Sequence, residues 1–209
     1  MQPAADPTGG RLVAVRRQAN ESDLFLLSLN GRAGPGLTHD SSPTIENNHW
    51  AFYPRFSPDG AQIFYDYDPS DPYNSYRVDL AIFASPAGAA TGSLQWTFPN
   101  PYTGGDVDPV PLRGGGLIYT RFSIDDQSQV RSQVWYQARP GSPGTPLTDA
   151  ADGCLQPAMS SDERQIAMIC THGQPQSAEL TTAGFDRTTP SLGPRTVLVR
   201  AQLAASPSF

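Results

Sequence analysis

The side chains in this chain that could do chemistry are concentrated in two short segments. Residues 39–50 hold two histidines, an aspartate and a tryptophan, and residues 66–76 hold three aspartates and three tyrosines. Imidazole and carboxylate groups at short spacing can ligate metals or act as acids and bases. The candidate binding residues are His39, Asp40, His49, Trp50, Asp66, Asp68, Asp71, Tyr73 and Tyr76.

The spacing within these segments argues against a metal. Asp66, Asp68 and Asp71 have the opening spacing of a calcium loop, but no glycine follows and Arg77 stands where a bidentate glutamate is needed. His39 and His49 are ten residues apart, and histidines so placed in a loop are usually exposed or bonded to backbone. We therefore expect no metal and no other cofactor, although the sequence leaves calcium at the aspartates open.

No motif of a self-contained enzyme accompanies these residues. The chain contains no Gly-x-Ser-x-Gly elbow, no glycine-rich phosphate loop, no His-Glu-x-x-His and no Cys-x-x-Cys. These motifs supply the nucleophile, the phosphate cradle or the metal ligands on which most such catalysis depends. We expect that the chain is not an enzyme and that the candidate residues bind a partner.

Composition narrows the choice of partner. The 209 residues carry 14 basic and 20 acidic side chains, and the resulting net charge of −6 makes nucleic acid an unfavourable partner. No stretch approaches 18 apolar residues, and the N-terminal residues lack a basic region followed by an apolar core, so we expect no membrane insertion. Proline (21) and glycine (19) are abundant, as in chains of many short strands joined by turns.

A ten-residue motif recurs at nearly constant spacing. The pattern Pro-x-Phe-Ser-Pro-Asp-Gly-x-x-Ile at 54–63 reappears as "PAMSSDERQI" at 157–166, and more weakly at 109–118 and 3–12. The motif opens again at Pro207, so the prolines stand 51, 55, 48 and 50 residues apart. We expect one domain of four repeats, spanning approximately 3–53, 54–108, 109–156 and 157–206.

Each repeat contains strand patterns in the same order. An apolar run follows the glycine-bearing turn, a second run comes next, and three repeats then show an apolar residue followed by threonine: Leu37-Thr38, Trp96-Thr97 and Leu147-Thr148. The last strand precedes the next proline, as in "HWAFY" and "VLVRAQLAA", which we expect to be inner strands. Four strands per repeat of about fifty residues, without helical periodicity, predict an all-β β-propeller of four four-stranded antiparallel blades.

The pattern leaves two forms of this propeller open. It is either part of a larger propeller or a closed four-bladed ring, in which the inner strand near the C-terminus pairs with the first blade. In both forms we expect Leu12, Ile63, Ile118 and Ile166 to be buried between blades. Ser57 to Gly60 is expected to be a structural turn, because proline presets φ, aspartate bonds the backbone and glycine takes a positive φ.

The motif at 54–63, followed by a strand and then Asp-Leu, resembles the TolB-type (WD-repeat-like) β-propeller repeat, which is also found in the propellers of prolyl-oligopeptidase-like enzymes. The resemblance covers essentially the whole chain. It implies a non-catalytic module that binds a protein or peptide at the bacterial cell envelope. The alternative is an accessory propeller that gates substrate for a hydrolase domain outside this chain.

Strand order predicts where the candidate residues lie. Connections after the second and fourth strands of a blade point to one face, and the segments 38–50 and 66–77 are both connections of this kind. The two segments belong to neighbouring positions in the ring. We therefore expect them to meet on one rim and to form the interaction surface.

The only two cysteines, Cys154 and Cys170, lie eight residues before and after Asp162 in the fourth copy of the turn. Residues equidistant from a hairpin turn lie opposite each other, at a separation that a disulfide can bridge. Two buried thiols, or a one-residue slip that separates the side chains, are the alternatives. A disulfide would indicate an extracytoplasmic location, in the periplasm, at the cell surface or secreted.

Overall fold

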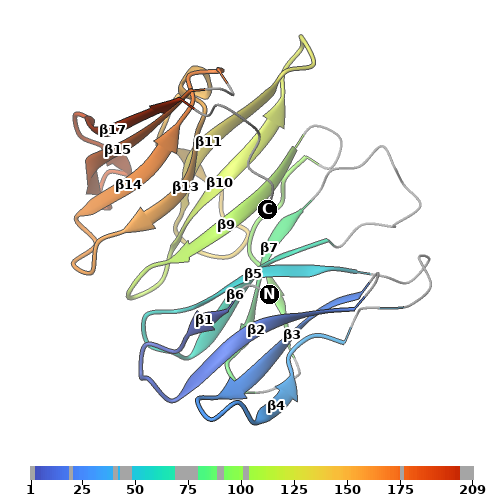
Figure 1. The fold of residues 1–209 in the computed structure, drawn as a ribbon. Coiled ribbons are helices and arrows are strands. Elements are labelled where there is room, and N and C mark those ends of the chain that lie inside the picture. The colour runs from blue at the N-terminus through green and yellow to red at the C-terminus, as the bar shows by residue number, and fades with distance from the viewer. Residues whose placement is uncertain are drawn as a thin grey trace.

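The chain folds into four consecutive antiparallel sheets that fan out from a common line (Figure 1). The structure is a computed structural model that describes residues 3–18, 21–39, 42, 49–68, 80–88, 92–100, 104–174 and 177–202. Within these ranges the only helical segment is a 3₁₀ turn, Ala150–Asp152. The predicted all-β fold class is confirmed.

Strands follow one another in each sheet in chain order, so each is the hydrogen-bonded neighbour of the next, except that β17 of the fourth sheet pairs with β15. The first sheet contains β1 (Ala4–Ala5), β2 (Arg11–Gln18), β3 (Glu21–Ser28) and β4 (Ala33–Gly36). The second contains β5 (Ala51–Phe56), β6 (Gln62–Tyr67), β7 (Ala81–Pro86) and β8 (Leu94–Gln95). The third contains β9 (Gly104–Pro111), β10 (Leu117–Ile124), β11 (Val130–Gln137) and β12 (Thr145–Pro146). The fourth contains β13 (Cys154–Met159), β14 (Gln165–Cys170), β15 (Ser177–Asp186), β16 (Ser191–Leu192) and β17 (Thr196–Gln202).

The repeated motif forms the turn between the first two strands of a sheet. In the second sheet the Ser57 hydroxyl donates to the Asp59 carboxylate at 2.6 Å, and Gly60 has φ of 71°. The fourth sheet repeats the bond between Ser160 and Asp162 at 2.6 Å. Because the turn bonds are local and both copies make them, the motif is a repeated structural unit.

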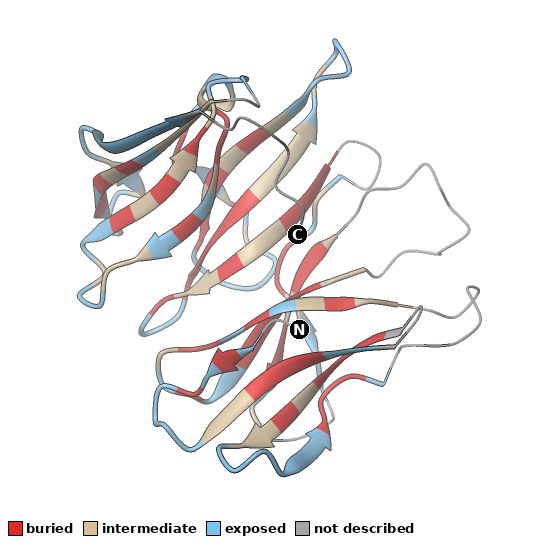
Figure 2. Ribbon diagram, viewed as in Figure 1, coloured by how far each residue is buried: buried red, intermediate tan, exposed pale blue. Residues whose placement is uncertain are grey.

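Three apolar clusters fill the spaces between consecutive sheets, and the buried positions follow the strands (Figure 2). Ile63, Ile118 and Ile166 are fully buried as predicted, whereas Leu12 is only half-buried. The third sheet departs from the sequence alignment because its turn is one residue shorter. Leu117, and not Ile118, therefore lies opposite the second residue after the repeat proline, as Ile63 does in the second sheet.

The apolar-threonine pairs extend the outer edge of the first three sheets. Each threonine hydroxyl accepts a hydrogen bond from a backbone N–H of the third strand where the short fourth strand has ended. The pairs are Leu24 to Thr38 at 3.0 Å, Ile82 to Thr97 at 2.9 Å and Val134 to Thr148 at 3.0 Å. A buried N–H group without a partner would be costly, so the threonine completes the sheet with a side chain instead of a strand.

The fourth sheet uses a strand at this place. β17 pairs with β15 from Ser177 to Thr182, and β16 pairs with the other end of β15. The expectation that "VLVRAQLAA" forms an inner strand is therefore wrong for its described part, because residues 196–202 occupy the open outer edge of β15. No other described strand pairs with β17, and Val197, Leu198 and Val199 are exposed.

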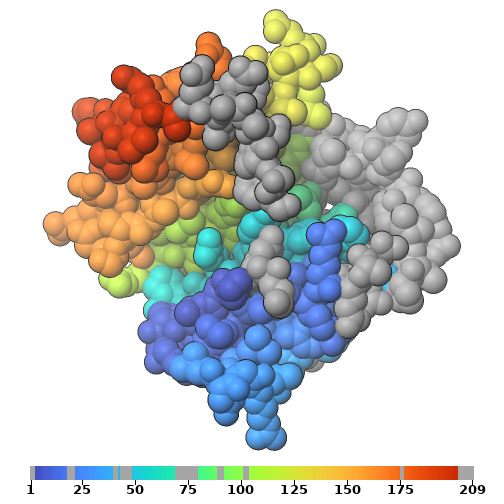
Figure 3. Space-filling model, viewed as in Figure 1, coloured from blue at the N-terminus to red at the C-terminus, as the bar shows by residue number. Residues whose placement is uncertain are grey.

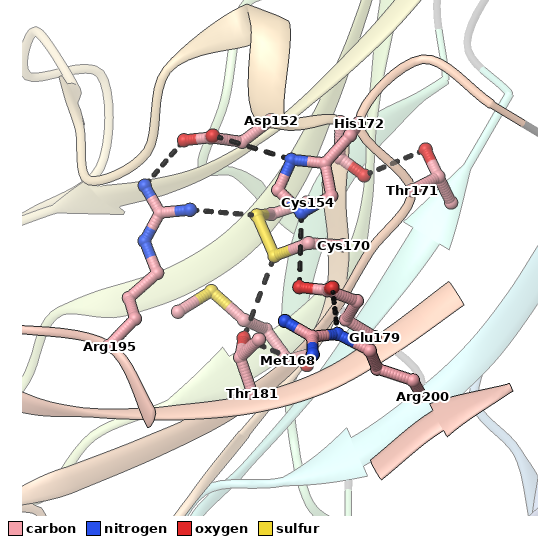
Figure 4. A network of polar contacts seen from close by, with 11 residues as sticks. Asp152, Cys154, Met168, Cys170, Thr171, His172, Glu179, Thr181, Arg195 and Arg200 are labelled. Atoms are coloured by element: carbon pink, nitrogen blue, oxygen red, sulfur yellow. Dashed lines mark hydrogen bonds and ion pairs between the residues drawn. A yellow bond between two sulfur atoms is a disulfide. The ribbon is translucent and has the colours of Figure 1, made fainter. Parts of the chain in front are cut away.

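Cys154 and Cys170 are register partners at the start of β13 and the end of β14, and a disulfide joins them. Polar side chains surround this bridge (Figure 4). His172 lies 3.2 Å from the Glu179 carboxylate and 3.8 Å from that of Asp152, and Arg195 also pairs with Asp152. The fourth sheet is thus braced by a covalent bond and by ion pairs that reach β17.

Contacts between sheets run from the first to the second, the second to the third and the third to the fourth. The space-filling view shows the same order across the visible surface: blue atoms of the first sheet and orange to red atoms of the fourth lie apart, with the cyan and green sheets between them (Figure 3). The inner strands β5, β9 and β13 lie side by side along the line where the sheets converge.

Candidate functional site

Three inner strands each contain one residue with the same unusual backbone conformation. Tyr53, Asp108 and Gln156 each precede the repeat proline of their strand and have φ of 44°, 57° and 53°. Each lies at a β-bulge, where the register between the inner and second strands shifts. The repeat therefore builds one backbone irregularity at equivalent positions in three sheets.

This backbone conformation is costly for residues that have a side chain. A left-handed φ outside glycine typically costs about 1–3 kcal/mol, and such residues cluster at functional sites. Glycine would remove much of the cost. Tyrosine, aspartate and glutamine are found instead, and a bulge re-aims the side chain that it carries. The bulges therefore direct three polar side chains towards the line of convergence.

Two of these bulges are each hydrogen-bonded by a side chain of the sheet that precedes their own in the chain. The backbone N–H of Asp108 donates to the carboxyl group of Asp66 at 3.4 Å, and that of Gln156 donates to the hydroxyl of Thr120 at 3.0 Å. Thr120 also donates to the Asp108 carboxylate at 3.2 Å. Asp66 and Thr120 lie on the second strands of the second and third sheets, so one polar position in each sheet secures the bulge of the next.

The bulges line a cavity of about 320 Å³. Its walls come from β5, β9 and β13, and the lining residues are Tyr53, Arg55, Asp108, Pro109, Val110, Gln156, Pro157 and Ala158. Tyr53 is 48% exposed, and the guanidinium of Arg55 carries no ion pair within the described ranges. We call this cavity the inner-strand pocket. It offers an aromatic ring, a cation, a carboxyl group and an amide to a ligand.

Asp66 lies behind the pocket and is almost completely buried. Its Oδ1 atom has no hydrogen-bond partner in the part of the chain that the structure describes. Burial raises the pKa of this carboxyl group well above its usual range, and the nearby carboxylates of Asp108 and Asp106 raise it further, although the charge of Arg55 opposes them. Burial therefore favours the protonated, neutral form of the Asp66 carboxyl group by raising its pKa, because a buried unpaired charge is costly.

The interface between the second and third sheets contains three more unpartnered polar atoms. Trp96 Nε1, the Tyr119 hydroxyl and Trp135 Nε1 are buried without a hydrogen-bond partner among the described residues. The guanidinium of Arg121 stacks over Trp135 at 4.3 Å and binds the fully buried Asp106 through two hydrogen bonds of 2.7 and 2.8 Å. This interface thus leaves several polar groups unsatisfied beside one well-paired ion pair.

The structure places the predicted rim only in part. Asp40, Asp71, Tyr73 and Tyr76 lie outside the described residues. His49 Nδ1 lies 3.0 Å from the backbone oxygen of Asp68, because β5 and β6 are paired and bring the ends of their two connections together. That these connections form the interaction surface remains a prediction.

The other described rim residues have distinct surroundings. Trp50 is half-buried beneath the guanidinium of Arg17, which lies 5.5 Å from its ring centroid. His39 is exposed, and its ring packs against Gly36 so closely that a Cβ there would meet it at 2.5 Å. Neither residue lines the inner-strand pocket.

Asp66 is the predicted rim residue that the structure shows to be buried in a strand. It was expected on the surface, but β6 extends to Tyr67, and Asp66 faces the third sheet, two positions after the buried Phe64. Successive side chains of a strand alternate between its faces, so residues 64 and 66 share one face. Asp66 cannot be an exposed loop ligand, and within the described ranges no group of three or more metal-ligating side chains forms a metal site.

Comparison with known proteins identifies the fold. No protein-family model matches the chain, and no curated protein matches it. Among solved structures, TolB from Acinetobacter baumannii aligns over 95% of this chain and 43% of its own length, with a TM-score of 0.64 at 16% identity. The architecture is a TolB-like β-propeller fold.

Two peptidases share the propeller. A puromycin-hydrolyzing peptidase from Mycobacterium tuberculosis aligns over 96% of this chain and 32% of its own, with a TM-score of 0.64 at 12% identity. Prolyl oligopeptidase B from Galerina marginata aligns over 96% and 31%, with a TM-score of 0.62 at 14% identity. This chain spans less than half the length of each of these proteins. Identities this low establish the fold alone.

In propeller terms the sheets are blades, and the inner-strand pocket lies where three blades converge. Sequence reasoning missed this pocket because it looked for chemistry in the longest connections. A usable signal was present: the residue before each repeat proline is polar or amphipathic and differs between copies, as Tyr53, Asp108 and Gln156 show. No helix in the described part of the chain is long and apolar enough to cross a membrane.

Proposed function

We propose that this chain is a non-catalytic propeller module that binds a protein or peptide partner at the cell envelope. The observation that carries the proposal is the inner-strand pocket, where three blades each maintain a strained residue with a functional side chain. Strain retained at equivalent positions around a cavity is an indication of binding.

The chemistry of the pocket suits an extended peptide. Arg55 and the Gln156 amide can donate to carbonyl oxygens, while Asp108 and the amide oxygen can accept from N–H groups. Tyr53 offers a half-exposed ring to a side chain. A volume of about 320 Å³ is at the lower end of small-ligand pockets, which fits one or two side chains of a segment that continues across the surface.

The lining supports binding more than catalysis. The lining contains no serine, threonine, cysteine, lysine or histidine, and Asp108 and Tyr53 are its only side chains of a type that serves as acid, base or nucleophile. Asp66 is the carboxyl group whose pKa is most strongly raised by burial, but it is enclosed behind the bulge of Asp108 and does not line the pocket. The most strongly perturbed acid is thus out of a ligand's reach, while Asp108, whose pKa burial also raises, lines the pocket without a basic side chain of histidine or lysine beside it.

The envelope location rests on two supporting observations. Cys154 and Cys170 are bonded within a short hairpin, and structural disulfides persist in oxidising compartments. The fold is shared with TolB. The second candidate function, an accessory propeller that gates substrate for a hydrolase domain, is favoured by the likeness to the two peptidases. A peptide-binding inner pocket is compatible with it, so the two functions differ in what lies beyond this chain.

The test is a selection of displayed random peptides on the purified chain. Enriched peptides are then measured against Arg55→Ala/Gln156→Ala. We expect at least about a tenfold loss of affinity, since a hydrogen bond to a charged group contributes about 1.5–3 kcal/mol. The control Arg164→Ala/Gln165→Ala removes the same two residue types from the exposed turn of the fourth blade and should bind like the parent chain.

Two outcomes would count against the proposal. If no peptide is enriched, or if the enriched peptides bind both variants equally well, the inner-strand pocket is not a peptide site. Hydrolysis of an enriched peptide by the parent chain, with loss of hydrolysis in the pocket variant, would contradict the non-catalytic assignment. Circular dichroism of all three proteins establishes that each is folded.

A further inference from the structure

The blades meet along three seams on the face that carries the turns 6–10, 57–61, 112–116 and 160–164. We call this the turn face. It lies at the opposite ends of the strands from the start of β5 and the end of β6, because successive strands are antiparallel. Each seam runs between the turn of one blade and the turn of the next, and an arginine closes the two outer seams but not the middle one.

An arginine closes the seam between the first and second blades. Arg11 donates to the backbone oxygens of Ala87 at 2.6 Å and Gly60 at 3.2 Å. Its charge is balanced by Asp6, whose carboxylate lies 2.7 Å away. The guanidinium therefore fills this seam, and its hydrogen-bond and ion-pair partners all belong to this chain.

An arginine also closes the seam between the third and fourth blades. Arg187 donates to the backbone oxygens of Arg113, at 2.6 Å, and of Gly115. Glu163 lies 3.9 Å from Arg187 and accepts the backbone N–H of Arg113 at 2.6 Å. Here again a guanidinium and a carboxylate of the same chain occupy the space between two turns.

The middle seam has no such closure. Between the turns of the second and third blades lies a groove of about 520 Å³. One wall consists of residues 57–62 without Gly60, the other of residues 111–116, and the rings of Phe64 and Trp96 form part of the lining. The two rings pack against each other with centroids 5.1 Å apart, so they present a fixed apolar surface.

The charges of this groove are unequally satisfied. Asp59 accepts hydrogen bonds from the Ser57 hydroxyl at 2.6 Å and from the backbone N–H of Ala61 at 3.0 Å, and these bonds lower its pKa. Within the described ranges the guanidinium of Arg113 makes no ion pair, unlike Arg11 and Arg187. What the middle seam lacks, relative to its neighbours, is an arginine–carboxylate pair that bridges the two turns: Asp59 is engaged by its own turn, and the Arg113 guanidinium has no carboxylate partner among the described residues.

We propose that this groove binds the free C-terminal carboxylate of a polypeptide that ends in an apolar residue. The carboxylate pairs with Arg113, and the last side chain lies on Phe64 and Trp96. The amide of Gln62 and the backbone of the glycine turn 114–116 also line the groove and can bond the final peptide group, which a small acid does not have. The site is separate from the inner-strand pocket and does not depend on the proposed function.

The first experiment titrates ¹⁵N-labelled protein with N-acetyl-L-phenylalanine, with its C-terminal amide and with 3-phenylpropionate. Of the three indole N–H resonances, only that of Trp96 should shift, and Trp96→Phe serves to assign it. A probe of this size should bind with a dissociation constant of the order of millimolar. We expect the amide to bind at least about tenfold more weakly, because it lacks the charge that Arg113 pairs with.

The second experiment uses two arginine variants with the same charge change. Arg113→Gln should weaken N-acetyl-L-phenylalanine about tenfold or more, whereas Arg164→Gln, on the corresponding turn of the fourth blade, should not change its affinity. Neither guanidinium makes an ion pair in the described part of the chain, so both variants should be as stable as the parent chain, and thermal melting checks this.

The results separate the parts of the proposal. No shift of the Trp96 resonance at 50 times the expected dissociation constant of about 1 mM would refute the site. Equal binding of the acid and the amide, or equal weakening by both arginine variants, would refute the pairing of a carboxylate with Arg113. Binding of 3-phenylpropionate as tight as that of N-acetyl-L-phenylalanine would refute a polypeptide C-terminus and assign the groove to small apolar acids.

Discussion

Two seams of the molecule have the same architecture but differ in how their polar groups are hydrogen-bonded. The former lies between the second and third blades, and the latter lies between the third and fourth. In the latter, Thr120 bonds both Asp108 and the bulge of Gln156, and Arg187 closes the turn face. In the former, Asp66 takes the place of Thr120 with one oxygen unpartnered, and the turn face has an open groove.

The difference has an energetic meaning. Each buried polar group without a partner costs about 1–3 kcal/mol, so a seam built only for stability would resemble the one between the third and fourth blades. That seam also contains the disulfide within its apolar cluster. The seam between the second and third blades is therefore less stable than it could be, because the equivalent polar groups of the next seam have hydrogen-bond partners. Functional sites are where such local costs are expected.

The largest effect should come from truncating the apolar contacts of the two seams. Leu117→Ala opens a cavity between the second and third blades, and Ile166→Ala opens one between the third and fourth. Each should cost about 2–5 kcal/mol in the free energy of unfolding, measured by urea denaturation. Ile166→Ala should lie at the upper end, because the disulfide limits how far its surroundings can collapse. A larger loss for Leu117→Ala would reverse this comparison.

Removing the disulfide should have the next largest effect. Cys154 and Cys170 are 16 residues apart, and a loop of that length corresponds to about 3 kcal/mol in the chain-entropy estimate. Cys154→Ala/Cys170→Ala should lower Tm by roughly 6–12 °C, given about 2–4 °C per kcal/mol for a chain of this size. Reducing agent should lower the Tm of the parent chain but not that of the variant. Free thiols in exported protein from the native host would refute the bridge.

A smaller effect is expected at the threonines that complete the outer edges. Thr97→Val and Thr148→Val keep the side-chain shape but leave the N–H groups of Ile82 and Val134 without acceptors. Each change should cost about 1–3 kcal/mol. Hydrogen exchange should speed up at those two amides in the respective variants, and unchanged exchange would show that water or backbone replaces the hydroxyl.

The smallest effect has the opposite sign and depends on pH. Because burial raises the pKa of Asp66 in the folded state above its ordinary value of 3.8, the folded protein holds a proton there that the unfolded chain releases. The contribution of Asp66 to stability therefore falls as pH rises from about 4 towards its raised pKa. Asp66→Asn, which does not titrate, should raise Tm at pH 7 and lose this advantage towards pH 4.

The pH profile of the parent chain contains opposing contributions. Asp59 and Asp162 have pKa values lowered by their turn hydroxyls, so stability from these turns is lost as pH falls through that range. The difference in Tm between Asp66→Asn and the parent chain cancels these terms. A difference that does not change between pH 4 and pH 7 would mean that Asp66 is ionised in the folded protein.

The features of the fold that sequence could predict are those determined locally or by repetition. Ser57, Asp59 and Gly60 make their own turn, and the spacing of the repeat prolines gives the number of blades. The threonines were visible as a recurring pair, although their role required the structure, since the bond joins Thr38 to a residue 14 positions earlier.

The candidate site was less predictable because it depends on contacts between blades. Asp66 reads as the first residue of an aspartate-rich loop, yet it shares a strand face with Phe64, and that alternation could have predicted its burial. The left-handed conformations of Tyr53, Asp108 and Gln156 arise from a register shift, which no single strand encodes. The pairing of β17 depends on which edge is open, and only three-dimensional arrangement decides that.

The placement of β17 has a consequence for how the protein behaves in concentrated solution. Val197, Leu198 and Val199 are exposed on a strand that no other described strand pairs with on its outer side. An unpaired edge of apolar residues is a template for adding strands from other molecules. Self-association should therefore begin at this edge, and a lysine at position 198 would act as a gatekeeper that keeps the chain monomeric during crystallisation or storage.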